Sequence, residues 1–267
     1  MTLGFIGCGN MATAIISGIY NSEAADTAEI YVYDVYQPAA ERLADKYPIT
    51  VLSSEKEIIV NCDTVILAVK PNVLAGILGK INNTLSESDT LLISIAAGKT
   101  VDFIRNTLSH DNRIIRVMPN INAVVGEAIS AYTANAAATE ADKQLCESIF
   151  GSVGQVIYLE ETQFPIFGVL GGSAPAFAYL FIDSLARAGV KNGMKKDAAL
   201  MIAAQTVLGS AKMILDSSAE DHPWELIDRV CSPGGTTIEG IAALQANGFE
   251  AAVTDAVDKT LAKDSKL

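Results

Sequence analysis

Short apolar runs alternate with helix-like stretches through the first part of the chain. The runs are Leu3–Ile6, Glu29–Tyr33, Ile49–Leu52, Thr64–Val69, Leu91–Ile95 and Ile114–Met118. Helix starts lie between them, signalled by Pro38, by Ser54 in a capping box with Glu57, and by Thr100. The run Thr64–Val69 carries no charge, as is typical of a parallel strand that is buried on both faces. This alternation predicts a parallel, doubly wound α/β sheet.

Two further strands, 128–134 and 155–159, are predicted on either side of a helix that begins near Thr139. After these strands the alternation ends, and only helical patterns remain. The predicted fold class is therefore α/β, with a Rossmann-type dinucleotide-binding domain over residues 1–161. An all-helical domain for dimerisation and substrate binding is predicted over residues 162–267.

One predicted helix of the second domain has no polar side. Residues 198–211, within the helical pattern 196–215, carry no charge on any face. Such a helix must be covered all round, and a small helical domain has little material with which to cover it. We therefore predict that the helical domains of two subunits interlock.

The uncharged stretch 162–182 is long enough to span a bilayer. It is interrupted by Pro165, Pro175 and three glycines, and Asp183 follows at once. We expect a buried helical segment here and no membrane span.

Composition narrows the class of protein. The chain has 267 residues, half of them apolar, and a formal net charge of −12, which argues against a nucleic-acid or anionic-membrane partner. Its four cysteines are widely spaced without a C-x-x-C pair, and the chain starts without a signal peptide, so a reduced cytoplasmic enzyme is expected. With only two histidines, far apart, no metal site is predicted.

The chemistry begins at a glycine motif between the first strand and the first helix. The G-x-G-x-x-A motif is Gly7, Cys8, Gly9, Asn10, Met11 and Ala12. In such a turn the first glycine permits the sharp bend, the second lets a pyrophosphate approach the backbone, and Ala12 keeps the helix close to the sheet. Asp34, at the end of the second strand, is placed to hold a ribose hydroxyl. A glycine turn of an ordinary α/β sheet is the alternative, which the co-occurrence of all these features disfavours.

Three other predicted strand ends carry small residues or residues that end regular secondary structure: Ala68–Pro71, Ala96–Gly98 and Pro119–Asn120. Ligands of doubly wound sheets bind beyond the carboxyl ends of the strands. Together with the glycine turn, these segments predict one crevice lined by backbone. Lys70 is the only charge among them, and a solvated loop lysine is its alternative interpretation.

A second informative stretch lies between two predicted helices. It reads Ser232, Pro233, Gly234, Gly235, Thr236, Thr237 and Ile238. Two glycines followed by two threonines at a helix start offer free backbone N–H groups and two hydroxyls, which can cradle a carboxylate. Plain helix capping by a threonine is the alternative.

Taken in order, these pieces resemble the pyrroline-5-carboxylate reductase family over nearly the whole chain. The matching segments are residues 5–12 (Phe-Ile-Gly-Cys-Gly-Asn-Met-Ala), 68–71 (Ala-Val-Lys-Pro), 94–98 (Ser-Ile-Ala-Ala-Gly), 116–120 (Arg-Val-Met-Pro-Asn) and 232–238 (Ser-Pro-Gly-Gly-Thr-Thr-Ile). The first is shared by many nicotinamide enzymes, whereas the last is specific. The resemblance implies a Rossmann domain joined to a helical dimerisation domain, often in a ring of dimers. It also implies hydride transfer from NADPH or NADH to the C=N carbon of a cyclic imine carboxylate, giving L-proline.

The resemblance and the crevice assign residues by position. Cofactor-binding residues are expected to be Gly7, Gly9, Asn10, Met11, Ala12, Asp34, Ala68, Val69, Lys70, Pro71, Ala97, Gly98 and Asn120. Substrate-binding residues are expected to be Ser232, Gly234, Gly235, Thr236 and Thr237, with Thr237 as the catalytic residue at the ring nitrogen. By resemblance, this second set comes from the partner subunit. No metal is expected.

The chain departs from the family pattern in three places. Asp34 is followed by Val-Tyr-Gln, with no cation to meet a 2′-phosphate, so NADH is favoured here over the family's usual NADPH. The family's Met-Pro-Asn-Thr-Pro continues as Ile121 and Asn122 after Asn120. A Gly-Ser-Gly-Pro turn has Ala174 at its third position, which is tolerable unless positive φ is needed.

Two other functions remain open from the residues: a related imine or hydroxy-acid dehydrogenase, and a non-catalytic dinucleotide-binding regulator. The match at 232–238, where substrate identity would be encoded, disfavours the first. The intact glycine turn and threonines disfavour the second.

Overall fold

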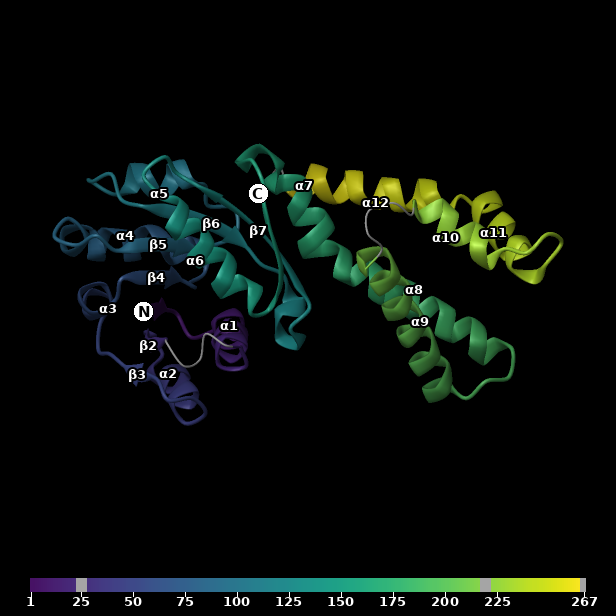
Figure 1. Ribbon diagram of the computed structural model, residues 1–267, viewed down its shortest axis with the longest axis horizontal. Helices are drawn as coiled ribbons and strands as arrows, with labels where there is room; N and C mark the ends of the chain where they lie inside the picture. The colour runs from purple at the N-terminus through teal and green to yellow at the C-terminus, as the bar shows by residue number, and fades with distance from the viewer. Residues whose placement is uncertain (23–27, 217–221, 265–267) are drawn as a thin grey trace. The chain divides into compact units, whose positions relative to one another are not determined.

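The computed structural model describes residues 1–22, 28–216 and 222–264, and the chain divides into two compact units. The first unit is Met1–Gly172 and the second is Ser173–Leu267. Figure 1 shows the sheet and its helices in the first unit and helices alone in the second. The predicted α/β fold class is confirmed.

The first unit is built on an eight-stranded sheet in the order β3-β2-β1-β4-β5-β6-β7-β8. Its strands are β1 (Thr2–Ile6), β2 (Glu29–Tyr33), β3 (Thr50–Val51), β4 (Thr64–Leu67), β5 (Leu91–Ser94), β6 (Ile114–Met118), β7 (Ala128–Ala134) and β8 (Gly154–Tyr158). The first six strands pair in parallel, as predicted. All eight strands lie where the apolar runs placed them, to within two residues at most ends.

The predicted parallel arrangement does not extend to β7, which runs antiparallel to β6 and parallel to β8. Only the short 3-10 helix η2 (Ile121–Val125) joins β6 to β7. A parallel connection needs a crossover of about a dozen residues or more. The connection here is too short, so the chain turns back.

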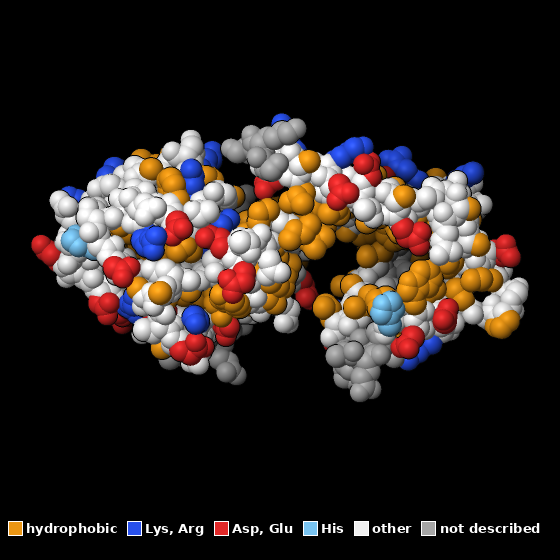
Figure 2. Space-filling model, turned by 90° about the horizontal axis from the view of Figure 1, so that it is seen from above, with side chains coloured by type: hydrophobic (Ala, Val, Ile, Leu, Met, Phe, Trp, Pro, Cys, Tyr) orange, Lys and Arg blue, Asp and Glu red, His pale blue; other side chains and the backbone are white. Residues whose placement is uncertain are grey.

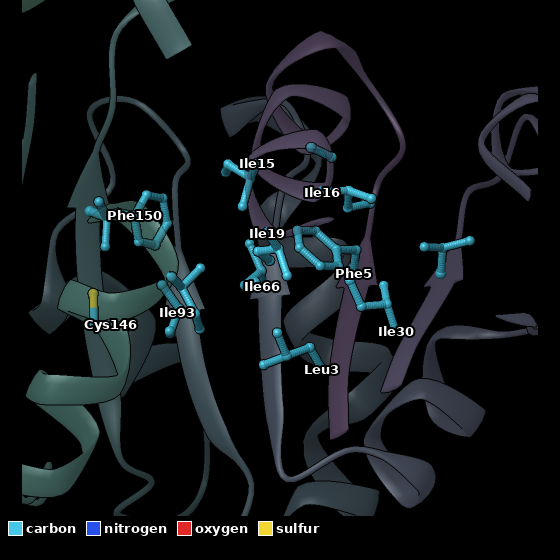
Figure 3. Close-up of a cluster of buried hydrophobic side chains, with 14 of the residues drawn as sticks. Leu3, Phe5, Ile15, Ile16, Ile19, Ile30, Ile66, Ile93, Cys146 and Phe150 are labelled. Atoms are coloured by element: carbon cyan, nitrogen blue, oxygen red, sulfur yellow. The ribbon is translucent and has the colours of Figure 1, made fainter. Parts of the chain in front are cut away.

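Helices cover both faces of the sheet. They are α1 (Asn10–Tyr20), α2 (Gln37–Ala44), α3 (Glu55–Asn61), α4 (Pro71–Leu85), α5 (Val101–Thr107) and α6 (Glu140–Gly151). One core cluster joins the strands to α1, α2 and α6, and another joins them to α3, α4 and α5. Figure 3 shows Phe5 of β1 packed beside Ile16 and Ile19 of α1. This two-sided cover accounts for the uncharged strand sequences.

The first unit continues beyond the predicted boundary at residue 161. It includes η3 (Glu161–Gln163), α7 (Phe164–Phe167) and most of the π-helical turn η4 (Gly168–Ser173). Phe164 and Phe167 are buried against Ala131 of β7. Two aromatic side chains that pack on the sheet keep this segment with the first unit, and the division between the two units falls after Gly172.

The second unit holds α8 (Ala174–Lys191), α9 (Lys196–Asp216), α10 (Pro223–Val230), α11 (Thr236–Ala246) and α12 (Phe249–Asp264). The predicted helical pattern 196–215 corresponds to α9, and the two helices predicted on either side of the stretch 232–238 correspond to α10 and α11, whereas α12 was not predicted. Small residues let α8 and α9 approach closely, because a Cβ added at Gly189 would lie 3.2 Å from the Cβ of Ala199. Among its described residues, the buried apolar side chains are Ala186, Ala199 and Ala203.

Apolar side chains of the helical unit are exposed instead of buried. The segment 162–182 is mostly helical. Its first part is buried at Phe164 and Phe167, but Tyr179 and Leu180 are 59% and 68% exposed, so within one chain the prediction of burial is wrong for the second part. On α9, Met201 is 67% exposed. Figure 2 shows such side chains gathered at the surface. Residues Glu161–Lys191 and Lys196–Asp216 are long and apolar enough to cross a membrane by length and composition alone.

Candidate active site

The glycine turn between β1 and α1 requires glycine at Gly7 for backbone reasons. Gly7 has φ +103°, and a Cβ added there would lie 2.5 Å from the carbonyl oxygen of Ala68. Gly9 differs, because it has an ordinary φ of −75° and an added Cβ would meet nothing within 4 Å. Gly7 therefore shapes the turn, whereas Gly9 leaves open space above it.

The N-terminus of α1 offers unsatisfied donors to this space. Its first intrahelical bond runs from the Thr13 N–H to the Gly9 carbonyl at 2.9 Å. The N–H groups of Asn10, Met11 and Ala12 precede that bond, no side chain caps them, and the first turn holds no acidic residue. Together with the helix dipole, these groups favour a phosphate. Ala12 is 1% exposed, as expected of a residue that lets α1 lie close to the sheet.

Asp34 is held against the glycine turn by two backbone donors. Its Oδ2 accepts from the Cys8 N–H at 2.7 Å, and its Oδ1 accepts from the Tyr36 N–H at 2.8 Å. Burial, and then the charge of Asp34, raise the pKa of the Cys8 thiol to about 12. Cys8 therefore stays a thiol at neutral pH.

Two cavities flank the glycine turn. The first, of about 390 Å³, is lined by Gly7, Asp34 and one face of α4. The second, of about 290 Å³, is lined by Gly9–Met11 and by the ends of β4, β5 and β6. Val69 lines both cavities. The glycine turn and the strand ends thus line two cavities that share Val69, where the sequence predicted one crevice.

The structure brings most of the predicted cofactor residues to these cavities. Gly7 and Asp34 line the first cavity, and the second is lined by Gly9, Asn10, Met11, Ala68, Val69, Lys70 and Ala97. Pro71 instead begins α4, and Gly98 lies in a turn with φ +69°. No ion pair is found for Lys70 within the described ranges, so its ammonium is available at the second cavity.

Asn120 is not among the lining residues. It is 5% exposed, and its Nδ2 donates to the Gly171 carbonyl at 2.9 Å. Its Oδ1 accepts from the Ile129 N–H at 3.4 Å. The side chain therefore ties the end of β6 to β7 and to the π-helical turn.

Arg116 is a site residue that the sequence reasoning did not single out. It lies on β6, is 5% exposed and lines the second cavity. Its Nη1 pairs with Glu161 Oε1 at 2.8 Å, and its guanidinium lies 4.3 Å from the Phe164 ring centre. The available signal was an arginine inside an otherwise apolar strand, which must find partners when buried.

The stretch Ser232–Ile238 forms the start of α11 in the second unit. Gly234 has φ +67°, and the Gly235 N–H donates to the Ser232 carbonyl at 2.9 Å. A Cβ at Gly235 would lie 2.3 Å from the Ser232 hydroxyl oxygen. Positive φ favours glycine at Gly234, and Gly235 packs closely against Ser232 in a tight turn that opens directly into the helix.

Neither threonine caps this helix, so the alternative interpretation of the stretch is wrong. Gly235 is the N-cap and provides no side-chain bond, and Thr236 and Thr237 are the first two helical residues. Both are exposed, and within the described parts of the chain no partner is found for either hydroxyl. Thr237 also lines a mainly apolar groove of about 410 Å³ between α9, α10 and α11. Two free hydroxyls and uncapped N–H groups suit a small carboxylate with an apolar body.

Two family models match the chain. Residues 161–267 match the model described as pyrroline-5-carboxylate reductase dimerisation. Residues 2–98 match the model described as NADP oxidoreductase, coenzyme F420-dependent. The first match covers the helical unit with α7 and η4, and the second covers the glycine turn and the first two strand ends of the crevice.

Relatives match over their whole length. The pyrroline-5-carboxylate reductase of Escherichia coli strain K12 is 40% identical over 99% of this chain and 97% of the relative. The solved structure of the pyrroline-5-carboxylate reductase from Coxiella burnetii matches with a TM-score of 0.93 at 31% identity, over 99% and 97% of the two chains. That of the pyrroline carboxylate reductase from Plasmodium falciparum, with NADP bound, matches with a TM-score of 0.83 at 32% identity, over 99% and 97%.

Proposed function

The chain belongs to the pyrroline-5-carboxylate reductase family and is an NAD(P)H-dependent oxidoreductase acting on a CH–NH group, and we propose that it works through the residues described above. The substrate is 1-pyrroline-5-carboxylate and the product is L-proline, in the last step of proline biosynthesis. One observation supports the choice of residues. A dinucleotide crevice and a helix start with two free threonine hydroxyls occur in the same chain.

The reaction needs positioning more than acid–base chemistry. A cyclic imine that is protonated in water is already electrophilic at its C=N carbon, and bound NAD(P)H supplies the hydride. The residues of the chain hold the two reactants in line and exclude water. The motifs over 232–238 contain no histidine or carboxylate, and none is required.

The start of α11 binds the two polar groups of the substrate, its carboxylate and its ring nitrogen. The N–H groups of Thr236 and Thr237 and the turn at Gly234 and Gly235 receive the carboxylate, where the helix dipole favours a negative charge. The Thr237 hydroxyl accepts from the iminium N–H and can later donate to the amine of the product, because a hydroxyl does both. Ser232 holds the turn through its carbonyl. By resemblance to the family, these groups come from the partner subunit.

The experiment that tests the function is the oxidation of NADH and of NADPH at 340 nm in the presence of 1-pyrroline-5-carboxylate. Turnover with either cofactor is the expected result. Turnover only with another cyclic imine would move the assignment to a related dehydrogenase. Cofactor binding without turnover on any imine would favour the non-catalytic regulator.

Asp34 makes NADH the preferred cofactor. Its carboxylate is fixed by the Cys8 and Tyr36 N–H groups and faces the first cavity. A carboxylate there accepts bonds from a ribose diol and repels a 2′-phosphate. The relative from Plasmodium falciparum was solved with NADP, so the preference proposed for this chain rests on its own residues.

Replacing Asp34 with asparagine is expected to raise the KM for NADH and lower that for NADPH. The change removes the charge but keeps the side chain's size, and hydrogen bonds to a charged group contribute about 1.5–3 kcal/mol. The ratio of the two kcat/KM values should therefore shift toward NADPH by about tenfold or more. Thermal unfolding of the variant controls for the two backbone bonds, because a large loss of stability would leave the ratio uninterpretable. An unchanged ratio in a stable variant would show that Asp34 does not face the 2′ position.

The helical units of two subunits cover each other's apolar faces. This assignment is supported by the exposed side chains of α8 and α9, by the few buried ones, and by the match to a dimerisation family. A ring of dimers is the larger assembly that the family resemblance implies. Burial of these faces in a dimer explains why the two helical segments are apolar, so no membrane is needed to explain them. The four free cysteines fit a reducing cytoplasm.

A Met201→Glu variant is expected to be a monomer where the unaltered protein is a dimer or larger. Met201 is 67% exposed on α9, and burying a glutamate in an apolar interface costs several kcal/mol. Sedimentation velocity at micromolar concentration measures the difference, with Lys196→Glu, exposed at the start of the same helix, as the control. A monomeric unaltered protein would contradict the assignment.

A further inference from the structure

The first cavity contains an ion pair that the proposed reaction does not use. Glu55 is the first residue of α3, and its side chain is 9% exposed. Its Oε1 lies 2.7 Å from the Nζ of Lys80 on α4. Both residues line the cavity that has Asp34 on another wall. Burying a charged carboxylate costs free energy unless it is paired, so the Glu55–Lys80 pair has a role that the proposed reaction leaves unassigned.

The face of α4 that carries Lys80 is shaped to receive a ligand. Asn72, Gly76 and Lys80 recur every four residues, so they lie on one side of the helix, and all three line the cavity. A Cβ added at Gly76 would meet nothing within 4 Å. Gly76, in the middle of this face, therefore leaves space for a ligand, and the Lys80–Glu55 ion pair lies at one end of the face.

Lys80 is the sole cation among the described residues that line this cavity, and Asp34 and Glu55 are the carboxylates. The charges −1, −1 and +1 leave the lining at −1. The hydrogen bond from Lys80 to Glu55, and then the charge of Glu55, raise the pKa of Lys80. Lys80 thus remains protonated and engaged. The other oxygen of Glu55 has no partner within the described chain and can accept a bond from a ligand.

We propose that Glu55 is a second determinant of cofactor choice, which selects an adenosine with an unphosphorylated ribose by keeping Lys80 occupied. This inference rests on the proposed function in placing the adenosine half of the cofactor in the first cavity. A ribose 2′-phosphate carries nearly two negative charges, and a lysine is an effective partner for it. Lys80 can meet that phosphate in two ways. It can stay beside Glu55, whose negative charge then repels the phosphate, or it can leave Glu55 as an unpaired, nearly buried carboxylate, which is unfavourable.

The test measures ligand binding by calorimetry without substrate. The ligands are adenosine 5′-monophosphate and adenosine 2′,5′-bisphosphate, followed by NADH and NADPH. In Glu55→Gln, the 2′-phosphorylated ligand of each pair is expected to tighten by about three- to tenfold relative to its partner, since Lys80 is freed but partly solvated. Raising the salt concentration should reduce this gain.

The matched control is the double variant Glu55→Gln/Lys80→Met. The gain should disappear in it, because it depends on the freed ammonium and not on the loss of the carboxylate alone. A gain that survives in the double variant, or no gain in a Glu55→Gln protein of unchanged melting temperature, would overturn the proposal.

Binding and turnover separate this proposal from the proposed function. If the unaltered protein fails to reduce 1-pyrroline-5-carboxylate but the binding ratio still shifts in Glu55→Gln, the reaction assignment fails and the role of Glu55 stands. If turnover is observed and the ratio does not shift, the reverse holds.

Discussion

A Gly7→Ala variant is expected to lose about 2–4 kcal/mol of folding stability, whereas Gly9→Ala should fold normally and lose most of its cofactor affinity. At Gly7 the backbone has φ +103°, and the added methyl would lie 2.5 Å from the Ala68 carbonyl oxygen. Either the turn or the end of β4 must move. At Gly9 the backbone angles suit alanine, and the change costs less than about 1 kcal/mol as a poorer N-cap.

The loss of affinity at Gly9 follows from where its methyl points. The space above Gly9 is open and lies beside the free N–H groups of α1, where the pyrophosphate is proposed to bind. A methyl there pushes the phosphate away from charge-assisted hydrogen bonds that contribute about 1.5–3 kcal/mol each. The dissociation constant should rise by about 10- to 100-fold.

Urea unfolding and cofactor titration, performed on both variants, separate the two effects. The Gly7 variant should show a lower unfolding midpoint with or without cofactor. The Gly9 variant should match the unaltered protein without cofactor and gain little stability when cofactor is added. Tight cofactor binding by Gly9→Ala would place the pyrophosphate elsewhere, and a fully stable Gly7→Ala would mean that the turn can relax.

A Thr237→Ala variant is expected to lower turnover by about 5- to 150-fold. The hydroxyl is exposed at the start of α11, does not cap the helix, and is proposed to bond the ring nitrogen of the substrate. Losing one such bond costs about 1–3 kcal/mol, which appears in kcat if the bond forms mainly in the transition state. Stability should change little, because no intramolecular bond of the described chain is removed.

Two neighbouring variants make this result specific. Thr237→Ser keeps the hydroxyl and should restore most of the turnover. Thr236→Ala, one residue earlier, removes a group proposed to bind the carboxylate and should mainly raise KM. An unchanged kcat in Thr237→Ala would reject the role assigned to its hydroxyl.

Some features of the fold and of the candidate site can be predicted from local sequence patterns alone. Uncharged runs such as that of β4 predict buried parallel strands, because both faces of each strand are covered by helices. The glycine turn at Gly7 and Gly9, and Asp34 at the end of β2, are local in sequence and recur wherever a backbone must approach a phosphate. Gly234, shortly before Thr236, belongs to the same class of signal, since its positive φ favours glycine.

Side-chain partners were less predictable. Whether Thr236 or Thr237 caps α11 depends on the turn at Gly235, and the structure makes Gly235 the N-cap. Asn120 reads as a strand-end residue open to a ligand, yet its amide binds Gly171, 51 positions away. No local pattern singles out Lys80, and its pairing with Glu55 follows from the packing of α3 beside α4.

Local sequence patterns were enough to predict the parallel strands β1 to β6, the glycine turn and a helix start near residue 237. These features depend on backbone conformation and hydrophobic period, which neighbouring residues set. The tertiary structure alone decided the antiparallel β7, the continuation of the first unit to Gly172, and the partners of Asn120, Arg116 and Glu55. Those outcomes arise where segments distant in the chain meet, and many weak packing contacts, none of which a local pattern encodes, select the arrangement.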